Sequence, residues 1–168
     1  SSRFGASNRY GTFPAASVGW IISQEDFLKD SNFVNLLKLR GSIGVTGNAG
    51  IGNFASLGLF NGSSYNKQSA INPSQLVNQD LKWEKTTTWN GGLDFGLLNG
   101  RISGAIDGYY RETEDLLNSV KMPVGTNFNA QMMKNIGSLK NYGVEFSINA
   151  KPIVSKDFTW DLTLEFNL

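Results

Sequence analysis

Two alternating runs of residues flank Asn99-Gly100, and they constrain the fold of this chain more than any other feature. Asparagine followed by glycine supplies the two residues with positive φ that a two-residue type I′ hairpin turn requires. The register of the hairpin then follows, with Leu98 opposite Arg101, and it divides the residues into two faces. The apolar face holds the pairs Leu97–Ile102, Phe95–Gly104, Leu93–Ile106, Gly91–Gly108 and Trp89–Tyr110. The other face holds the pairs Gly96–Ser103, Asp94–Ala105, Gly92–Asp107, Asn90–Tyr109 and Thr88–Arg111, and therefore carries the charges.

The length of this apolar face is unusual for a soluble protein. From Trp89 to Leu97 the strand spans about 26 Å, whereas ordinary soluble strands are commonly about 17–20 Å long. An apolar band of this height, closed by an aromatic pair at one rim, is typical of a strand that crosses an outer membrane. The hairpin therefore predicts a wall and not a catalytic cleft.

The composition supports a β-rich fold and argues against nucleic-acid binding. Glycine accounts for 19 of 168 residues, aromatic residues reach 12% and charged residues only 17%. Glycine favours turns and aromatic residues favour strands, while charged residues usually reach about 25%. A net charge of +1 provides no positive field to attract nucleic acid.

The chain has no cysteine and no histidine. It therefore has no disulfide, no thiolate nucleophile, no imidazole base and none of the commonest ligands of zinc. We expect no catalytic residue, no metal site and no cofactor. The sequence also has no apolar run long enough for a transmembrane helix, but strands of a barrel escape this test because only alternate residues are apolar.

Alternation and turn residues predict about six long strands. We expect strands within residues 13–22, 37–45, 89–97, 102–111, 141–150 and 158–168, and a short helical turn within residues 24–35. Residues 46–85 and 112–140 lack periodicity, so we expect two long loops there. Short and long connections alternate along the chain, which in an up-and-down meander places all long loops on one rim. The predicted fold is all-β, an antiparallel meander that forms an arc of a transmembrane barrel.

A series of short motifs resembles one family of membrane proteins. In chain order they include Ser2-Arg3-Phe4-Gly5, Leu37-Lys38-Leu39-Arg40-Gly41-Ser42, Leu81-Lys82-Trp83-Glu84-Lys85-Thr86, Gly92-Leu93-Asp94-Phe95, Asn135-Ile136-Gly137 and Asn141-Tyr142-Gly143-Val144-Glu145. Together they resemble the C-terminal barrel portion of TonB-dependent outer-membrane transporters of the SusC/RagA type. The match covers nearly the whole chain, and the ordered set is more specific than any one motif.

The resemblance implies a 22-stranded barrel with an N-terminal plug, located in the outer membrane. Such transporters import glycans or peptides with energy from the TonB complex and with a SusD-like lipoprotein as a lid. We therefore interpret residues 1–168 as a partial barrel, a segment that lacks the plug and the remaining strands and contacts outer-membrane lipid on its apolar face. We expect no enzymatic activity and no nucleic-acid partner.

Within this interpretation the two faces have separate roles. Trp20, Trp89, Tyr110, Phe158 and Trp160 lie near the ends of predicted strands, as expected for an aromatic girdle at the lipid interface. The charged residues of the polar face should look into the lumen, as a hydrated wall, as contacts of the plug or along the path of the substrate. They are Lys38, Arg40, Asp94, Asp107, Arg111, Glu145, Asp161 and Glu165.

Three aromatic residues of the first long connection are candidates for ligand binding. The rings of Phe54, Phe60 and Tyr65 could stack on the sugar rings of a glycan, although simple packing of the loop is the better-supported explanation. Two other interpretations stay open at this point. One is a soluble β-sandwich or lectin-like module that binds glycans, and the other is a structural or adhesive surface protein.

Overall fold

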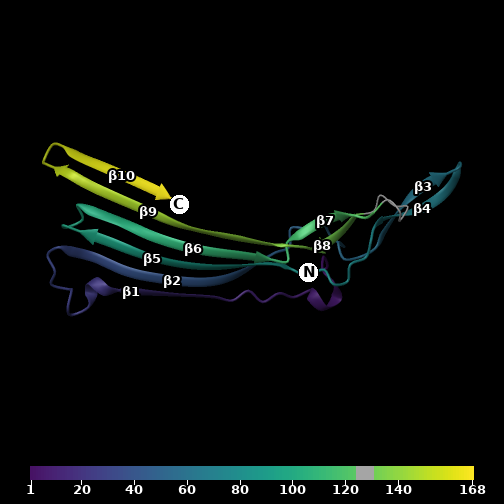
Figure 1. Cartoon of the computed structure of the whole chain (residues 1–168), viewed down its shortest axis with the longest axis horizontal. Coiled ribbons are helices and arrows are strands. Elements are labelled where there is room, and N and C mark those ends of the chain that lie inside the picture. The colour runs from purple at the N-terminus through teal and green to yellow at the C-terminus, as the bar shows by residue number, and fades with distance from the viewer. Residues whose placement is uncertain (124–130) are drawn as a thin grey trace. The chain divides into compact units, whose positions relative to one another are not determined.

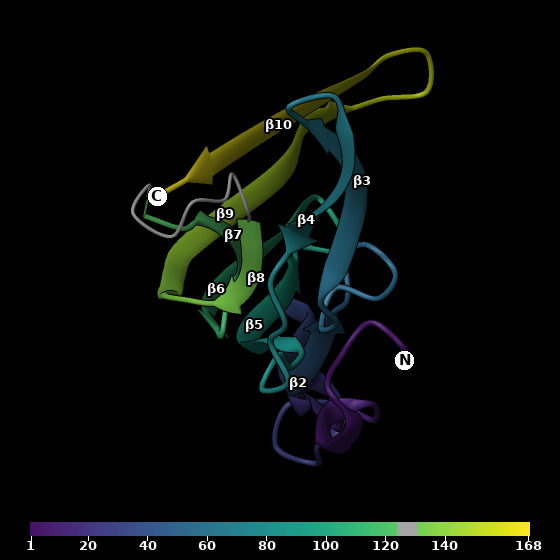
Figure 2. The ribbon, with the colours of Figure 1, turned by 90° about the vertical axis from the view of Figure 1, so that its right-hand side faces the viewer.

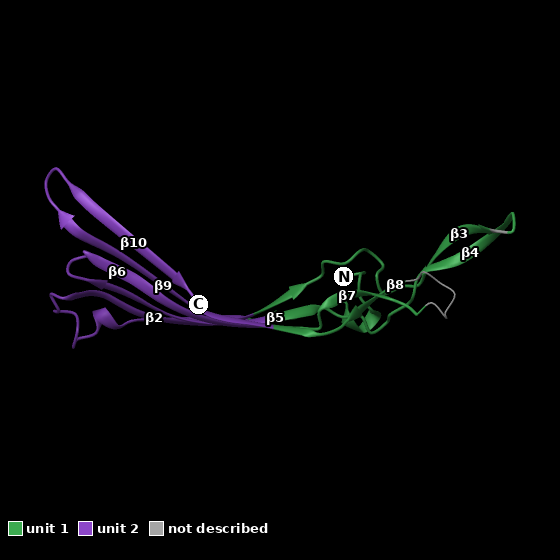
Figure 3. Ribbon diagram, turned by 45° about the horizontal axis from the view of Figure 1, so that its top comes forward, with its two compact units in different colours: residues 1–14, 45–86, 112–139 green, residues 15–44, 87–111, 140–168 purple. Residues whose placement is uncertain are grey.

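The computed structural model describes residues 1–123 and 131–168, which form two compact units (Figure 3). Unit 1 consists of Ser1–Pro14, Val45–Thr86 and Glu112–Leu139, and unit 2 of Ala15–Gly44, Thr87–Arg111 and Lys140–Leu168. The regular elements of the described residues are two short 3-10 turns, η1 (Ala6–Asn8) and η2 (Ile22–Gln24), and β-strands. In this part of the chain, no helix is long and apolar enough to cross a lipid bilayer.

One sheet has six strands, in the order β1-β2-β5-β6-β9-β10 (Figure 1). Its strands are β1 (Ala15–Ile21), β2 (Val34–Asn48), β5 (Glu84–Leu97), β6 (Ile102–Glu114), β9 (Ser138–Val154) and β10 (Thr159–Asn167). β1 pairs with β2 and β9 pairs with β10 in antiparallel register. The prediction of about six long strands in an all-β, antiparallel arrangement is therefore confirmed.

The turn between β5 and β6 forms as the sequence predicts, with one addition. Asn99 and Gly100 have φ of 57° and 79°, and the Arg101 amide donates to the Leu98 carbonyl over 3.2 Å. Leu98 also has a positive φ of 53°, which the Asn-Gly motif does not predict. The side chain of Asn35 holds the turn, because its carbonyl oxygen accepts from the Asn99 amide at 2.6 Å.

Side-chain contacts agree with the predicted register of this hairpin. The rings of Trp89 and Tyr110 lie with their centroids 5.4 Å apart. A β-carbon added to Gly104 would lie 2.7 Å from the ring of Phe95, so these two residues are also neighbours. Both contacts join residues of the predicted apolar face. If the register were shifted by one residue, these side chains would lie on opposite faces of the sheet.

The alternation of faces extends to both outer pairs of the sheet. In β1 and β2, Trp20 lies opposite Leu39, and in β9 and β10, Leu164 lies opposite Ile148. The apolar side chains of this face are largely exposed, including Val18 at 72% and Leu164 at 44%. An exposed apolar face of this extent indicates that the sheet contacts an apolar environment and not water.

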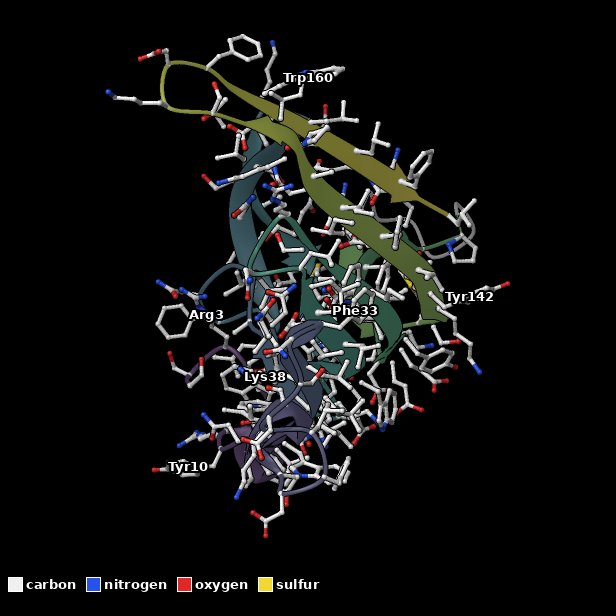
Figure 4. The ribbon with its side chains drawn as sticks, turned by 90° about the vertical axis from the view of Figure 1, so that its left-hand side faces the viewer. Arg3, Tyr10, Phe33, Lys38, Tyr142 and Trp160 are labelled. Atoms are coloured by element: carbon white, nitrogen blue, oxygen red, sulfur yellow. The ribbon has the colours of Figure 1, made fainter. Side chains whose placement is uncertain are left out.

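Aromatic side chains lie near both ends of the apolar face. Figure 4 shows Trp160 near the start of β10 and Tyr142 near the opposite end of the β9–β10 pair. Trp160 pairs with Ile153, eleven residues along β9 from Tyr142, which corresponds to about 36 Å of strand, or less across a membrane when the strand is tilted. Trp20, Trp89 and Phe158 are also exposed, as expected for a girdle.

Unit 1 has its own small hydrophobic core, formed by the buried side chains of Phe4, Ile51, Ala55 and Leu81. The Trp83 ring packs against this core, with its centroid 4.7 Å from that of Phe4. The Gly5 amide donates to the Leu81 carbonyl at 3.2 Å, which ties the start of the chain to this core.

The two long connections are not simple loops, and here the sequence-based prediction is wrong. They contain β3 (Leu59–Tyr65), β4 (Gln68–Gln75), β7 (Leu117–Lys121) and β8 (Gln131–Asn135), in a second sheet of order β3-β4-β8-β7. β3 and β4 form an antiparallel hairpin (Figure 2). The expected short helical turn is present within residues 24–35, where the Lys29 amide donates to the Glu25 carbonyl at 2.8 Å, and the 3-10 turn η2 precedes it.

Candidate functional site: the polar face of the six-stranded sheet

An ion-pair network lies at the centre of the polar face of unit 2. The Nε of Arg40, on β2, lies 3.1 Å from a carboxylate oxygen of Asp94 on β5, and its Nη2 lies 2.7 Å from Asp107 on β6. The three side chains are only 26–38% exposed. One guanidinium therefore bridges two carboxylates from two other strands, and charge-assisted bonds of this kind are stronger than neutral ones.

Gly92 makes room for this network. A β-carbon at this position would lie 2.5 Å from an oxygen of Asp107 and 2.7 Å from the guanidinium carbon of Arg40. Gly92 is buried, so these charged groups cover its backbone. Glycine therefore lets both ions approach the strand closely, and a larger residue here would displace the ends of the Arg40 and Asp107 side chains.

Two cavities of this face meet at the network. The larger, of about 720 Å³, is lined by Arg40, Asp107, Arg111 and Glu145 together with polar side chains of neighbouring strands. The smaller, of about 330 Å³, is lined by Lys38, Arg40 and the glycines of adjacent strands. The lining carries charges of both signs, and so suits a hydrated surface that passes or contacts polar groups.

The structure brings six of the eight predicted polar-face residues together. Lys38, Arg40, Asp94, Asp107, Arg111 and Glu145 all lie in the network or line the two cavities. The other two lie on β10, where Asp161 is 3.7 Å from Lys151 and Glu165 lies opposite Ser147. Sequence reasoning did not single out Ser42, Asn90, Tyr109 and Asn141 as site residues, although the strand alternation places them on this same face.

Phe54 and Phe60, the two loop aromatics whose side chains the structure describes, do not both line the cavity of unit 1. Phe54 lines a cavity of about 490 Å³ in unit 1, together with Arg9, Gln79 and Asp80. Phe60 does not line this cavity and is 67% exposed on β3. The side chain of Tyr65 lies outside the described residues.

Removal of the bridging cation gives the first testable prediction. Arg40→Leu leaves Asp94 and Asp107 without their common partner, and we expect a loss of about 1–2 kcal/mol of stability, reduced by the partial exposure of the pair. Chemical unfolding of the full-length protein in detergent measures this loss. Lys38→Leu, two residues along the same face of β2, is the matched control because Lys38 forms no ion pair with any of the residues that the structure describes.

Replacement of both aspartates in the Arg40→Leu variant checks the cause of that loss of stability. Adding Asp94→Asn and Asp107→Asn to Arg40→Leu removes the two carboxylates that repel each other, so we expect part of the stability to return. Equal stability of Arg40→Leu and Lys38→Leu would show that the network contributes nothing measurable.

Long amphipathic strands, an exposed apolar face between two aromatic ends and a charged, hydrated opposite face define a segment of the wall of a membrane β-barrel. Comparison with known families gives the same result. The family model described as "TonB dependent receptor-like, beta-barrel" matches residues 1–168. The chain belongs to this family, whose members are outer-membrane β-barrels and not enzymes.

Several characterised relatives are similar over nearly the whole chain. TonB-dependent receptor SusC of Bacteroides thetaiotaomicron is 60% identical over 97% of the chain, and TonB-dependent receptor P39 of Formosa agariphila is 46% identical over 99%. Among solved structures, the RagAB peptide importer in its closed-closed state matches 99% of the chain at 35% identity, with a TM-score of 0.87. The chain spans only 17% of SusC, 16% of P39 and 18% of the RagAB chain.

Proposed function

We propose that this chain is part of the barrel wall of an outer-membrane importer that takes up glycans or peptides by a TonB-dependent mechanism. The observation that carries the proposal is the six-stranded sheet with one apolar and one charged face, in a chain of the TonB-dependent receptor family. The related receptor SusC and the RagAB peptide importer support import as the activity. In the proposed arrangement the apolar face contacts lipid and the polar face lines the lumen.

The Arg40 network and its two cavities would then line part of the path of the substrate, or form part of the surface against which a plug rests. Charges of both signs keep such a wall hydrated, and their mutual pairing prevents them from holding a charged substrate tightly. We propose the same lumenal orientation for Asp161 and Glu165, which share the polar face of β9 and β10.

A SusD-like lipoprotein is the proposed partner at the outer side, and the TonB complex the proposed source of energy. The β3–β4 hairpin of unit 1 offers a surface for such a partner. Phe60 and Ile71 are 67% and 74% exposed, and the register places Phe60 opposite Pro73 on the face that Ile71 shares. An exposed apolar strip on a hairpin is a common feature of protein contacts.

Uptake by intact cells tests the proposed activity. Labelled oligosaccharides and labelled peptides are supplied to cells with and without the full-length protein, and with and without a functional TonB complex. We expect uptake of one class of substrate only when both are present. Accumulation that does not need TonB would contradict import, and a defect in surface attachment alone would favour the structural or adhesive interpretation.

The cavity next to Phe54 is the proposed contact for substrate in unit 1. Phe54 has φ of 61°, an uncommon backbone conformation for a residue with a large side chain. The side-chain amide nitrogen of Gln75 holds this turn by donating to the carbonyls of Phe54, Ala55 and Leu57 at 2.7–3.1 Å. Strained conformations of this kind are often retained at ligand sites. The Phe54 ring is 52% exposed, so it can still stack on a bound sugar or peptide group.

Replacement of this ring gives the second prediction. Phe54→Ala should weaken substrate binding about 3- to 10-fold, because a stacked aromatic ring contributes about 0.5–1.5 kcal/mol beyond its buried area. Titration of the purified full-length protein with the imported substrate measures the effect. Phe60→Ala removes an equally large and more exposed ring that does not line the cavity, so an equal loss in both variants would contradict the assignment.

A further inference from the structure

The apolar face of unit 2 is not a smooth surface. A trough of about 700 Å³ crosses it next to one aromatic end, and its lining is almost entirely apolar. The walls are Trp89 and Tyr110 on one side and Tyr142, Val144 and Leu168 on the other. All of these residues belong to unit 2, and none of them takes part in the Arg40 network on the opposite face.

Two glycines form the floor of the trough. Gly91 and Gly108 line it, from the neighbouring strands β5 and β6, and a β-carbon at either position would meet no atom within 4 Å. Neither glycine has the positive φ that only glycine adopts readily, so the backbone does not require glycine here. The two glycines leave space where β5 and β6 would otherwise each carry one side chain on this face.

The size and the chemistry of the trough match one kind of occupant. Neighbouring strands lie about 4.8 Å apart, so two facing glycines open a slot about as wide as a single hydrocarbon chain. The mostly apolar lining offers water few hydrogen bonds, and apolar walls without a neighbour lose dispersion contacts. In an outer-membrane protein the apolar face adjoins lipid, and an acyl chain is the apolar group available there.

The aromatic residues fix the depth of this slot. Tyrosine and tryptophan collect at the level of the lipid headgroups, so the Trp89–Tyr110 pair marks the interface and the trough extends from there into the hydrocarbon region. Tyr142 is 77% exposed at the same end, with its hydroxyl available to a polar headgroup. Tail and headgroup of one lipid would therefore both find partners.

We propose that the trough floored by Gly91 and Gly108 holds one acyl chain of an outer-membrane lipid as a defined binding site, in contrast to the fluid lipid around the rest of the barrel. The inference rests on membership of an outer-membrane family and not on import, so the two proposals can fail separately.

Lipid retention by the full-length protein tests this site. The protein is purified in mild detergent with a phosphatidylethanolamine of defined acyl chains, and bound lipid is counted by native mass spectrometry during stepwise delipidation. Gly91→Leu with Gly108→Leu fills the slot from both strands, and we expect the apparent affinity for lipid to fall about tenfold, since about two methylene contacts are lost. Gly91→Ala, which adds a single methyl group, should give a smaller loss in the same direction.

Ala150→Leu is the matched control. Ala150 lies opposite Leu162 on the apolar face of β9 and β10, outside the trough, so its replacement places a leucine side chain on the same face without filling the slot. We expect this variant to retain lipid as the unaltered protein does. Equal retention in all variants, or an equal loss in Ala150→Leu, would overturn the inference. Normal TonB-dependent uptake together with either result would leave the proposed function intact.

Discussion

Leu164→Arg is expected to destabilise the full-length protein in a lipid bilayer by about 2–4 kcal/mol, the cost of placing arginine on the lipid face near the bilayer midplane. Leu164 lies opposite Ile148 on the apolar face, four residues along β10 from Trp160. From this position an arginine side chain would have to extend far along the strand to place its guanidinium at the headgroup level of either aromatic end. The measurement is reversible unfolding of the protein from lipid vesicles, monitored by tryptophan fluorescence.

Glu165→Arg is the control for this prediction. Glu165 is the next residue of β10, lies opposite Ser147 on the polar face, and keeps a charged side chain when replaced. We expect a change of less than about 1 kcal/mol, because an exposed charge contributes little. If Glu165→Arg were the more harmful of the two, the faces would be inverted relative to the membrane, and the lumenal assignment of the charged residues would be wrong.

Leu81→Ala is expected to lower the local stability of unit 1 by about 2–5 kcal/mol, the usual cost of truncating a fully buried leucine. Leu81 is 0% exposed and belongs to the cluster formed with Phe4, Ile51 and Ala55. Among the described residues, Trp83, Leu117 and Met133 also pack against this cluster, so truncation of Leu81 removes contacts at its centre. Hydrogen exchange of the amides around Gly5 and Leu81 measures the effect, because local opening is read by exchange.

Leu57→Ala provides the comparison. Leu57 belongs to the same unit but is 49% exposed, so its truncation removes little buried surface, and exchange should change only slightly. Faster exchange in both variants to the same extent would show that the cluster around Leu81 does not hold unit 1 together.

The sequence was sufficient for the six-stranded sheet because two independent signals agree there. Asn99-Gly100 fixes the turn, and alternation on both sides fixes which residues share a face, so the contact of Trp89 with Tyr110 could be predicted. Strand lengths were underestimated. β2, for example, extends from Val34 to Asn48, and its last three residues, Thr46, Gly47 and Asn48, include no apolar side chain that could extend the alternation.

The strands of the second sheet could not be predicted for a related reason. β3 and β4 contain mostly Asn, Ser, Gln and Gly, and their backbones pair without burying one face. Their turn also lacks the usual signal, because its two residues with positive φ are Asn66 and Lys67 instead of Asn and Gly. A hairpin that is held mainly by backbone hydrogen bonds between its strands need not show alternating apolar residues in its sequence.

The candidate site was predictable in its face but not in its contacts. Alternation placed Arg40, Asp94 and Asp107 on one side of the sheet, yet the three residues come from three strands. The pairing of β2 with β5 is not encoded by a local turn, so the sequence could not show that one arginine bridges both carboxylates. The cavity at Phe54 likewise depends on Arg9 and Asp80, which lie far apart in the chain.

The absence of a side chain at Gly92 allows the charged groups of Arg40 and Asp107 to lie directly against the backbone of β5. The space of a β-carbon at this position is already filled by the guanidinium of Arg40 and a carboxylate oxygen of Asp107. A side chain at position 92 would separate these ions, whereas loss of Arg40 would free the space and leave the carboxylates unbalanced. A larger residue at position 92 therefore fits only where the two charged side chains move aside, and loss of Arg40 is compensated only where Asp94 and Asp107 change as well, so four positions on three strands of this wall depend on one another.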